Sequence, residues 1–324
     1  MLLLEMDRLE GVLTMRAAID LLEMAALHED AGDTVVSPRL NTGFDTGWMR
    51  ILFAVDKASG YFATKSYHMI QNVGVRYVVS LYTLKDGALV ALIDGRAITD
   101  LRTGAASGVV ARKVPIKGPV EIGIIGSGYQ ARTQLVSLAA VYDVASASVY
   151  SPTSANRERF AREMTAQLGF PVKAATSAEA ATRGKAVVAA ASSNVSKEPA
   201  VWGEWLDGCR LLCAVGSTRA EQTEADLRCF ADAALVVIDT QRAMEDSGDL
   251  KEATNAGLLM DSKLKTVAQL VGGKVAVPDS GMIVFKSIGT ALQDLALAAS
   301  YYEELRDLPG IEKGANVASL KPKA

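Results

Sequence analysis

A glycine-rich turn is the first feature of this sequence whose residue types and spacing could do chemistry. Gly126, Gly128 and Ala131 form a Gly-x-Gly-x-x-Ala pattern directly after the apolar run Ile122–Ile125, and a helix-compatible segment follows. In such a pattern the first glycine permits a tight turn, the second lets backbone N–H groups approach a pyrophosphate, and the small third residue lets helix and strand pack closely. The helix N-terminus then faces the phosphates. The pattern predicts a dinucleotide-binding site.

The end of the next expected strand, Ser146–Tyr150, bears on which dinucleotide binds. An acid at this point would hold the ribose hydroxyls of NAD, but no carboxylate occurs between Asp143 and Glu158. The segment instead offers hydroxyls, an amide and a guanidinium, from Ser151, Thr153, Asn156 and Arg157. Such groups suit a 2′-phosphate, so we expect NADP(H) to be preferred, with NAD(H) possible.

Three basic residues in the first third of the chain are candidates for binding a carboxylate. Arg39 follows Pro38 at an expected strand start, Lys65 lies in a strand, and Arg102 lies on a helix. Buried arginine and lysine are the side chains with which proteins hold carboxylates. Their spacing alone does not distinguish these three from solvated surface bases.

The elements that must position these residues change character along the chain. The pattern predicts a helix over Met15–His28 and then a largely antiparallel sheet from Val35 to Asp94, with turns at Asp56–Gly60 and Lys85–Gly87. A helix from about Thr99 to Lys113 ends at the Pro/Gly stretch of residues 115–119, where we expect a domain boundary.

From Val120 onward short apolar strands alternate with helices, which is typical of βαβ units and a parallel sheet. The expected strands are Glu121–Ile125, Ser146–Tyr150, Val172–Ala175, Ala186–Ala190, Leu211–Val215 and Leu235–Asp239. Helices are expected at Ala131–Ala140 and Ser154–Leu168. A last apolar helix is expected over Ile288–Leu305. Asp294 at its start could orient one of the three basic residues, but we favour a polar contact that supports the helix.

Composition excludes several classes of protein. The 324 residues are 49% hydrophobic with a net charge of −3, which suits about two folded domains and no disordered chain. The sequence has no basic block of nucleic-acid binders and no apolar run of membrane-span length, so we expect neither partner. Three cysteines and no secretory leader favour reduced thiols and a cytoplasmic location. With only two histidines, no metal site is expected.

Three segments together resemble the ornithine cyclodeaminase/mu-crystallin family. They are Ala91–Ser107, Gly126–Ala131 and Val284–Ala296, in the order found in that family, and the similarity runs from about Met15 to Leu305. The resemblance implies an α/β fold in which a Rossmann-type NAD(P)-binding domain, residues 116–288, is inserted into an α+β substrate-binding and dimerisation domain, residues 1–115 plus 289–324. It also implies a homodimer.

The resemblance further implies roles for individual residues. Arg39, Lys65 and Arg102 match the family's carboxylate-binding residues, and we expect them to be the catalytic residues. The family's cofactor contacts match Ser127, Tyr129, Gln130, Ser151, Thr153, Asn156, Val215 and Ser287. Ser192 matches another contact, although a longer segment at Ser193–Lys197 blurs the register. Pro152 stands where relatives that prefer NADP often carry arginine, and Arg157 is the candidate to replace it.

One departure from the family bears on the reaction. Cyclodeaminases resemble Gly-x-Asp where this chain has Gly216-Ser217-Thr218, and a threonine hydroxyl neither binds an ammonium well nor acts as a base. We therefore expect reduction of a cyclic ketimine such as Δ1-pyrroline-2-carboxylate or Δ1-piperideine-2-carboxylate, or interconversion of a 2-oxo acid and an amino acid. Thr218 is then a substrate-site residue. Ornithine cyclodeaminase activity and a non-catalytic NADP-dependent binding protein are the alternatives.

Overall fold

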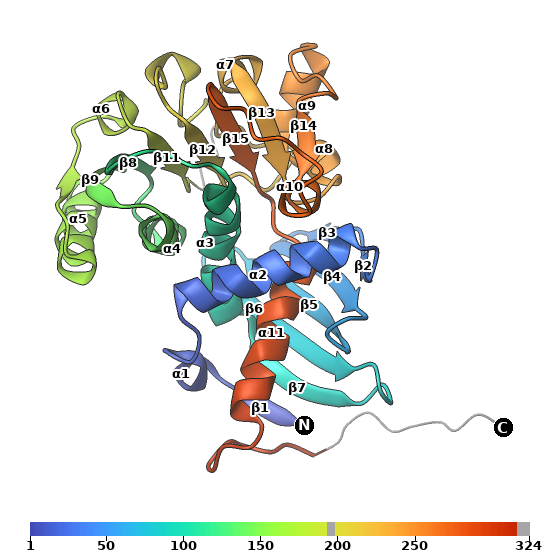
Figure 1. The fold of residues 1–324 in the computed structure, drawn as a ribbon. Coiled ribbons are helices and arrows are strands. Elements are labelled where there is room, and N and C mark those ends of the chain that lie inside the picture. The colour runs from blue at the N-terminus through green and yellow to red at the C-terminus, as the bar shows by residue number, and fades with distance from the viewer. Residues whose placement is uncertain (193–197, 316–324) are drawn as a thin grey trace. The chain divides into compact units, whose positions relative to one another are not determined.

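The computed structural model describes residues 1–192 and 198–315 and divides the chain into two compact units (Figure 1). Unit 1 comprises Met1–Arg102 and Thr290–Ala324, and unit 2 comprises Thr103–Gly289. The first boundary lies inside the helix α3 (Gly95–Lys113) and not at residues 115–119. Side chains from the second half of this helix, such as Val110, are buried in the core of unit 2, which explains the earlier boundary.

Unit 1 is built on a mainly antiparallel sheet. Within the described residues its strand order is β1-β7-β6-β5-β4-β2, with β3 paired to β4, and only the β1–β7 pair is parallel. Its elements are β1 (Leu2–Leu4), α1 (Met6–Leu9), α2 (Met15–Asp30), β2 (Thr34–Val36), β3 (Leu40–Phe44), β4 (Gly47–Asp56), β5 (Tyr61–Ile70), β6 (Gly74–Thr83), β7 (Leu89–Asp94) and α11 (Ala291–Leu305). The C-terminal helix α11 packs against β4, β5 and α2 (Figure 1).

The expected antiparallel sheet and its turns are confirmed, but the strands are longer than the apolar runs indicate. β4, β5 and β6 each span ten residues and pair along their whole length. The two turns use glycines with positive φ, Gly60 at 80° and Gly87 at 73°.

Unit 2 is built on a sheet whose described strands all run parallel, as expected. The strand order is β10-β9-β8-β11-β12-β15-β13-β14, so the chain reverses its direction of propagation between β8 and β11. The elements after α3 are β8 (Val120–Ile125), α4 (Tyr129–Val141), β9 (Val144–Tyr150), α5 (Ser154–Leu168), β10 (Val172–Ala174), α6 (Ala178–Thr182), β11 (Val187–Ala190), a 3₁₀ turn (Gly203–Trp205), β12 (Leu211–Ala214), α7 (Leu227–Ala231), β13 (Ala233–Ile238), α8 (Ala243–Asp246), α9 (Gly248–Asn255), β14 (Leu264–Thr266), α10 (Val267–Val271) and β15 (Met282–Lys286).

Two strands of unit 2 are absent from the sequence-based expectation. β15 inserts between β12 and β13, so the last strand of the unit lies in the middle of the sheet. The short strand β14 pairs with β13 at the edge. The last helix begins at Ala291, three residues after Ile288, because Thr290 and Gln293 form a capping box that fixes its N-terminus.

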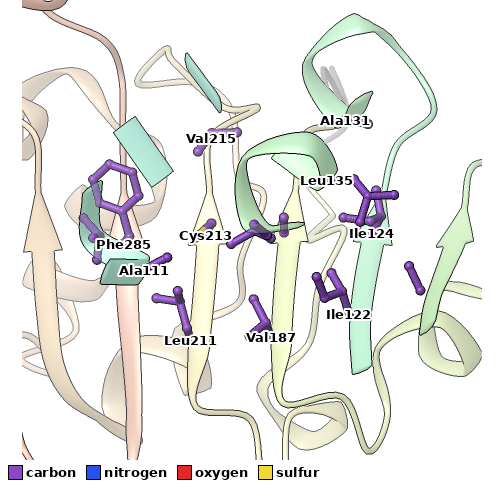
Figure 2. Packing of buried hydrophobic residues seen from close by; sticks show 14 of the residues in the cluster. Ala111, Ile122, Ile124, Ala131, Leu135, Val187, Leu211, Cys213, Val215 and Phe285 are labelled. Atoms are coloured by element: carbon purple, nitrogen blue, oxygen red, sulfur yellow. The ribbon is translucent and has the colours of Figure 1, made fainter. Parts of the chain in front are cut away.

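The core of unit 2 covers both faces of its sheet. One buried cluster joins Ile122, Ile124 and Val187 of the sheet to Leu135 of α4 (Figure 2), and it continues to α3, α5 and α10. A second cluster joins the alternate strand residues to α6, α7, α8 and α9. This doubly covered sheet is the arrangement in which ligands bind beyond the carboxyl ends of the strands at the point of reversal.

No helix in the described part of the chain is long and apolar enough to cross a membrane.

Candidate functional site

The predicted dinucleotide turn lies at the carboxyl end of β8, beside the reversal point of the sheet in unit 2. Gly126 has a φ of 108°, and a Cβ there would stand 2.7 Å from the carbonyl oxygen of Ala191. Gly128 is the N-cap residue of α4 and, being glycine, has no side chain to cap the first N–H groups of the helix. A tight glycine turn that opens directly into a helix N-terminus fits a pyrophosphate, because the first backbone N–H groups of the helix point toward it.

The end of β9 carries the predicted contacts for the adenosine half of the cofactor. The Ser127 hydroxyl donates to the Ser151 hydroxyl at 2.9 Å, so the first two strand-end loops of the unit are joined. Arg157 donates from Nη1 to the carbonyl oxygens of Ser151 (2.9 Å) and Pro152 (3.3 Å), and its guanidinium stacks 5.5 Å from the centroid of the Tyr150 ring. The positive charge of Arg157 is therefore held beside the loop that follows β9.

The other predicted cofactor contacts lie on the loops and helix starts at the same edge of the sheet. Tyr129 and Gln130 begin α4 and Thr153 caps α5 without a side-chain hydrogen bond, whereas Asn156 lies in the first turn of α5. Val215 follows β12 and Ser192 follows β11, and Ser193–Lys197 lie outside the described residues. The Ser287 hydroxyl is buried and donates to Asp239 at 2.7 Å, so its oxygen remains as the acceptor for a ligand.

The predicted carboxylate-binding residues of unit 1 share one electrostatic environment. Lys65 of β5 is 3% exposed and donates to the Thr99 hydroxyl at 2.6 Å and to the Asp294 carboxylate at 2.7 Å. Arg102, on α3, lies 3.5 Å from the same carboxylate oxygen. Arg39, in the loop before β3, is near enough to lower the pKa of Lys65.

Burial lowers the pKa of Lys65 to about 8, and the positive charges of Arg102 and Arg39 act in the same direction. The Asp294 carboxylate opposes this shift both by its charge and by its hydrogen bond. The aromatic rings of Tyr67 and Tyr77 flank the ammonium at 5.5 and 5.4 Å. A lysine with a pKa near neutrality is suited to give or take a proton at physiological pH.

The favoured expectation, that Asp294 supports its helix, is wrong, and the alternative, that it orients one of the basic residues, fits the structure. Its carboxylate is buried in the first turn of α11, where it pairs with Lys65 and Arg102. The reason is that α11 packs on β5, so a carboxylate on this face of the first turn needs a countercharge. Gln293, one residue earlier, accepts from Arg102 at 3.3 Å.

Sequence reasoning missed a second set of charged residues, in unit 2. Lys286, at the end of β15, is fully buried, and its ammonium lies 2.7 Å from Asp249 and 3.8 Å from Glu224. Glu224 accepts hydrogen bonds from the loop that carries Gly216 and Thr218. A lysine that ends an otherwise apolar strand, Met282–Lys286, is the one signal in the sequence that could have indicated such a cluster.

Thr218, the predicted substrate residue of unit 2, lies in this same loop. Its backbone N–H points to the side-chain oxygen of Gln222 at 3.4 Å. Within the described residues, no group of three or more His, Cys, Asp or Glu side chains could hold a metal ion.

Comparison with known proteins places the chain among enzymes of amino-acid and imine chemistry. The Δ1-pyrroline-2-carboxylate reductase of Bacillus cereus is 30% identical over 70% of this chain and 70% of its own length. The solved structure of the Thermococcus litoralis Δ1-pyrroline-2-carboxylate reductase with NADH and L-proline has a TM-score of 0.90 and 29% identity, over 97% of this chain and all of that chain.

An archaeal alanine dehydrogenase dimer with bound NAD has a TM-score of 0.85 and 25% identity, and the match covers 94% of this chain and 95% of that one. The model of the ornithine cyclodeaminase/mu-crystallin family matches residues 1–308. That match covers nearly the whole chain. It includes both the dinucleotide turn and the Lys65 cluster, which consists of Lys65, Arg39, Arg102 and Asp294. The chain belongs to the ornithine cyclodeaminase/mu-crystallin family.

Proposed function

We propose that this protein is an NAD(P)H-dependent reductase of imines that carry a carboxylate next to the C=N bond. The favoured substrates are Δ1-pyrroline-2-carboxylate and Δ1-piperideine-2-carboxylate, and the interconversion of a 2-oxo acid and an amino acid is the related possibility. The observation that carries the proposal is the buried lysine with a pKa of about 8, held beside Arg39 and Arg102 in a chain that also has a dinucleotide turn.

Reduction of an imine adds a hydride to carbon and a proton to nitrogen. Bound NAD(P)H supplies the hydride. Arg39 and Arg102 hold the substrate carboxylate, since guanidinium groups bind carboxylates with two parallel hydrogen bonds. Lys65 completes this set of bases and, in its protonated form, gives or stabilises the proton on the imine nitrogen. Asp294 and Thr99 hold the lysine ammonium in place through the hydrogen bonds of 2.7 and 2.6 Å.

The loop at Thr218 supports reduction over cyclodeamination. Where cyclodeaminases resemble an aspartate, this chain has threonine, and the nearby Glu224 is fully buried and accepts backbone N–H groups. Glu224 is therefore no substitute for the missing carboxylate. L-Ornithine cyclodeamination and cofactor-dependent binding without chemistry are the outcomes against which the reductase is tested.

We propose NADP(H) as the preferred cofactor, with NAD(H) accepted. Support comes from the first turn of α5, which contains no acidic residue, and from Arg157, whose charge is held beside Ser151. A helix N-terminus and a guanidinium both favour a 2′-phosphate. The two solved relatives described above hold NADH and NAD, which fits a site that accepts NAD(H) as well.

We propose that the protein is a homodimer formed through the open face of the sheet in unit 1. On β4, Met49, Ile51 and Phe53 are exposed and alternate with buried Arg50, Leu52 and Ala54, so the exposed face of this strand is apolar. Val78 of β6 is exposed on the same face, because it lies in register with Ser66 of β5 and through it with Ile51. An apolar sheet face of this kind on a soluble chain marks an interface. The alanine dehydrogenase relative is a dimer.

We also propose a cytoplasmic location. The three cysteines are free and buried, and burial raises the pKa of Cys209 and Cys213 to about 12. Unpaired, unreactive thiols suit a reducing compartment.

The reductase proposal predicts consumption of NAD(P)H by the purified protein with Δ1-pyrroline-2-carboxylate. The absorbance of the reduced nicotinamide should fall, and L-proline should form in equal amount. L-Ornithine with NAD⁺ should give no ammonia. Absence of turnover with both cyclic imines and with a panel of 2-oxo acids plus ammonia would refute the proposal and leave the non-catalytic alternative.

The role of Lys65 predicts a specific change in the pH profile. The protonated lysine is the active form, so kcat/KM, which reports the pKa of the protein without substrate, should fall as pH rises through about 8. In Asp294→Asn the carboxylate that raises the pKa of Lys65 is gone, so the fall should begin at lower pH. Lys65→Met should lose about 10²- to 10⁴-fold in kcat with cofactor affinity retained. The exposed Lys57→Met is the control, and an unchanged profile in Asp294→Asn would contradict the assignment.

The cofactor proposal predicts a lower KM for NADPH than for NADH. Arg157→Met should raise the KM for NADPH about tenfold, the value of one charge-assisted hydrogen bond, and leave the KM for NADH unchanged. Arg162→Met is the matched control, because Arg162 is an exposed arginine further along α5, away from the helix N-terminus. Equal effects of Arg157→Met on both cofactors would argue against a 2′-phosphate site.

The interface proposal predicts that the double variant Ile51→Lys/Phe53→Lys is a monomer, because the charges would be buried in the dimer. Light scattering after size-exclusion chromatography measures the mass directly. Met24→Lys, at an exposed apolar position on α2, should remain a dimer. A monomeric wild-type protein, or a dimeric double variant, would show that this face is not the interface.

A further inference from the structure

One buried carboxylate joins two neighbouring strand-end loops of unit 2. Glu224 is fully buried, and its two oxygens accept from different loops. Oε1 accepts from the N–H of Ser192, after β11, at 2.9 Å, whereas Oε2 accepts from Gly216 (2.8 Å) and Ser217 (3.3 Å), after β12. A carboxylate with both oxygens engaged fixes the separation of the two backbones.

The loops that Glu224 joins are in close contact. A Cβ on Gly216 would stand 2.3 Å from Glu224 Oε1 and 2.3 Å from the carbonyl oxygen of Ser192. Only glycine therefore allows the loops to approach this far. The neighbouring Ala191 meets Gly126 in the same way, so the dinucleotide turn and both loops form one packed edge.

Charged groups behind Glu224 keep it in place. The Lys286 ammonium, from β15, lies 3.8 Å from Glu224, 2.7 Å from Asp249 of α9, and 2.8 Å from the carbonyl oxygen of Ser217. Asp249 in turn accepts from the backbone N–H of Glu224 at 2.6 Å and of Ala225 at 3.0 Å. Asp249 thus holds the backbone of Glu224, and Lys286 lies beside its carboxylate.

The position of the two loops that Glu224 joins indicates a role in dinucleotide binding. β11 lies between β8 and β12, so the loops after β11 and β12 border the dinucleotide turn at the reversal point of the sheet. They carry Ser192 and Val215, two of the predicted cofactor contacts. Ligand affinity at such an edge depends on backbone placement, because backbone groups make many of the contacts.

We infer that Glu224 is a positioning residue for the dinucleotide, which it serves by holding the backbone of Ser192 to that of Gly216 and Ser217. This inference rests on the proposed cofactor binding. Glu224 itself does not touch the cofactor and takes no part in the transfer of the hydride or the proton.

The test is the dissociation constant of NADH, measured by fluorescence, for the full-length Glu224→Gln variant. Glutamine has one acceptor oxygen, so its NH₂ group would face a backbone N–H of one loop, and that loop would move away. We expect the dissociation constant to rise about tenfold, with kcat at saturating cofactor within about twofold of the wild type. A purely structural role would instead lower the active fraction, and hence kcat, and leave the dissociation constant unchanged.

The matched control is Asp226→Asn. Asp226 lies two residues further along, caps α7 and accepts from the backbone N–H groups of Gly203 and Cys229, not from those of Ser192, Gly216 and Ser217. The NADH dissociation constant of this variant should equal that of the wild type. Gly216→Ala should reproduce the Glu224→Gln effect, because its methyl group would push the loops apart.

The pH dependence of NADH binding to the wild-type protein is a second test of this role. Burial raises the pKa of Glu224 to about 7, with Asp249 acting in the same direction and Lys286 against it. Protonation removes one acceptor, so NADH affinity should weaken between pH 8 and pH 6, and this trend should be absent in Glu224→Gln. Lys286 of β15 and Asp249 of α9 are the charged groups that face Glu224 in the described residues.

The outcomes separate the two proposals. If the wild-type protein does not bind NADH or NADPH, the proposed function fails. If the wild-type protein binds NADH, but Glu224→Gln and Gly216→Ala bind it equally well, the role of Glu224 is overturned and the proposed function stands.

Discussion

The buried ion pair between Lys65 and Asp294 is the interaction on which the architecture of unit 1 depends. It joins β5 to α11, two elements whose paired residues are 229 positions apart in the chain. Both side chains are almost fully buried, and removal of one partner from a buried pair costs about 3–5 kcal/mol because the other charge is left uncompensated. The C-terminal helix α11 is therefore held to the sheet of unit 1, although the whole of unit 2, Thr103–Gly289, lies between them in the sequence.

Unit 2 also has a buried cluster of charged side chains, but its net charge has the opposite sign. Around Lys65 three bases, Arg39, Lys65 and Arg102, share one carboxylate, so the cluster has a net charge of +2. Around Lys286 two carboxylates, Glu224 and Asp249, share one ammonium, which leaves −1 above the pKa of Glu224, where both are ionised. The negative excess is balanced by backbone N–H groups of the loops. The positive excess suits an anionic ligand, although the whole chain carries a net charge of −3.

How far the sequence predicts this structure depends on whether the signal is local. The glycine turn at Gly126–Gly128 and the alternating strands and helices after it are local patterns, and the structure confirms both. β15 was missed because its place between β12 and β13 is a tertiary property that no spacing encodes. The same holds for Asp294, whose helix position was evident but whose contact with Lys65 depends on how α11 packs.

The residues of the candidate site divide in the same way. Resemblance, and not spacing, selects Lys65, Arg39 and Arg102. The structure adds that Asp294, in the first turn of α11, contacts both Lys65 of β5 and Arg102 of α3. Glu224 could not be found at all from the sequence. It lies in a polar stretch, Arg219–Glu224, that resembles a solvated loop, and only the fold buries it beneath two strand ends.

The net charge of the Lys65 cluster also bears on when the lysine is protonated. Without substrate, burial and two arginines keep the pKa of Lys65 near 8, so the ammonium form prevails only modestly at neutral pH. A substrate carboxylate bound to Arg39 and Arg102 would cancel part of the positive potential at the ammonium and raise its pKa. The proton would then be held most firmly when the imine is present to receive it. An amine product keeps the same carboxylate, so release of the product, and not the proton transfer itself, returns Lys65 to its lower pKa.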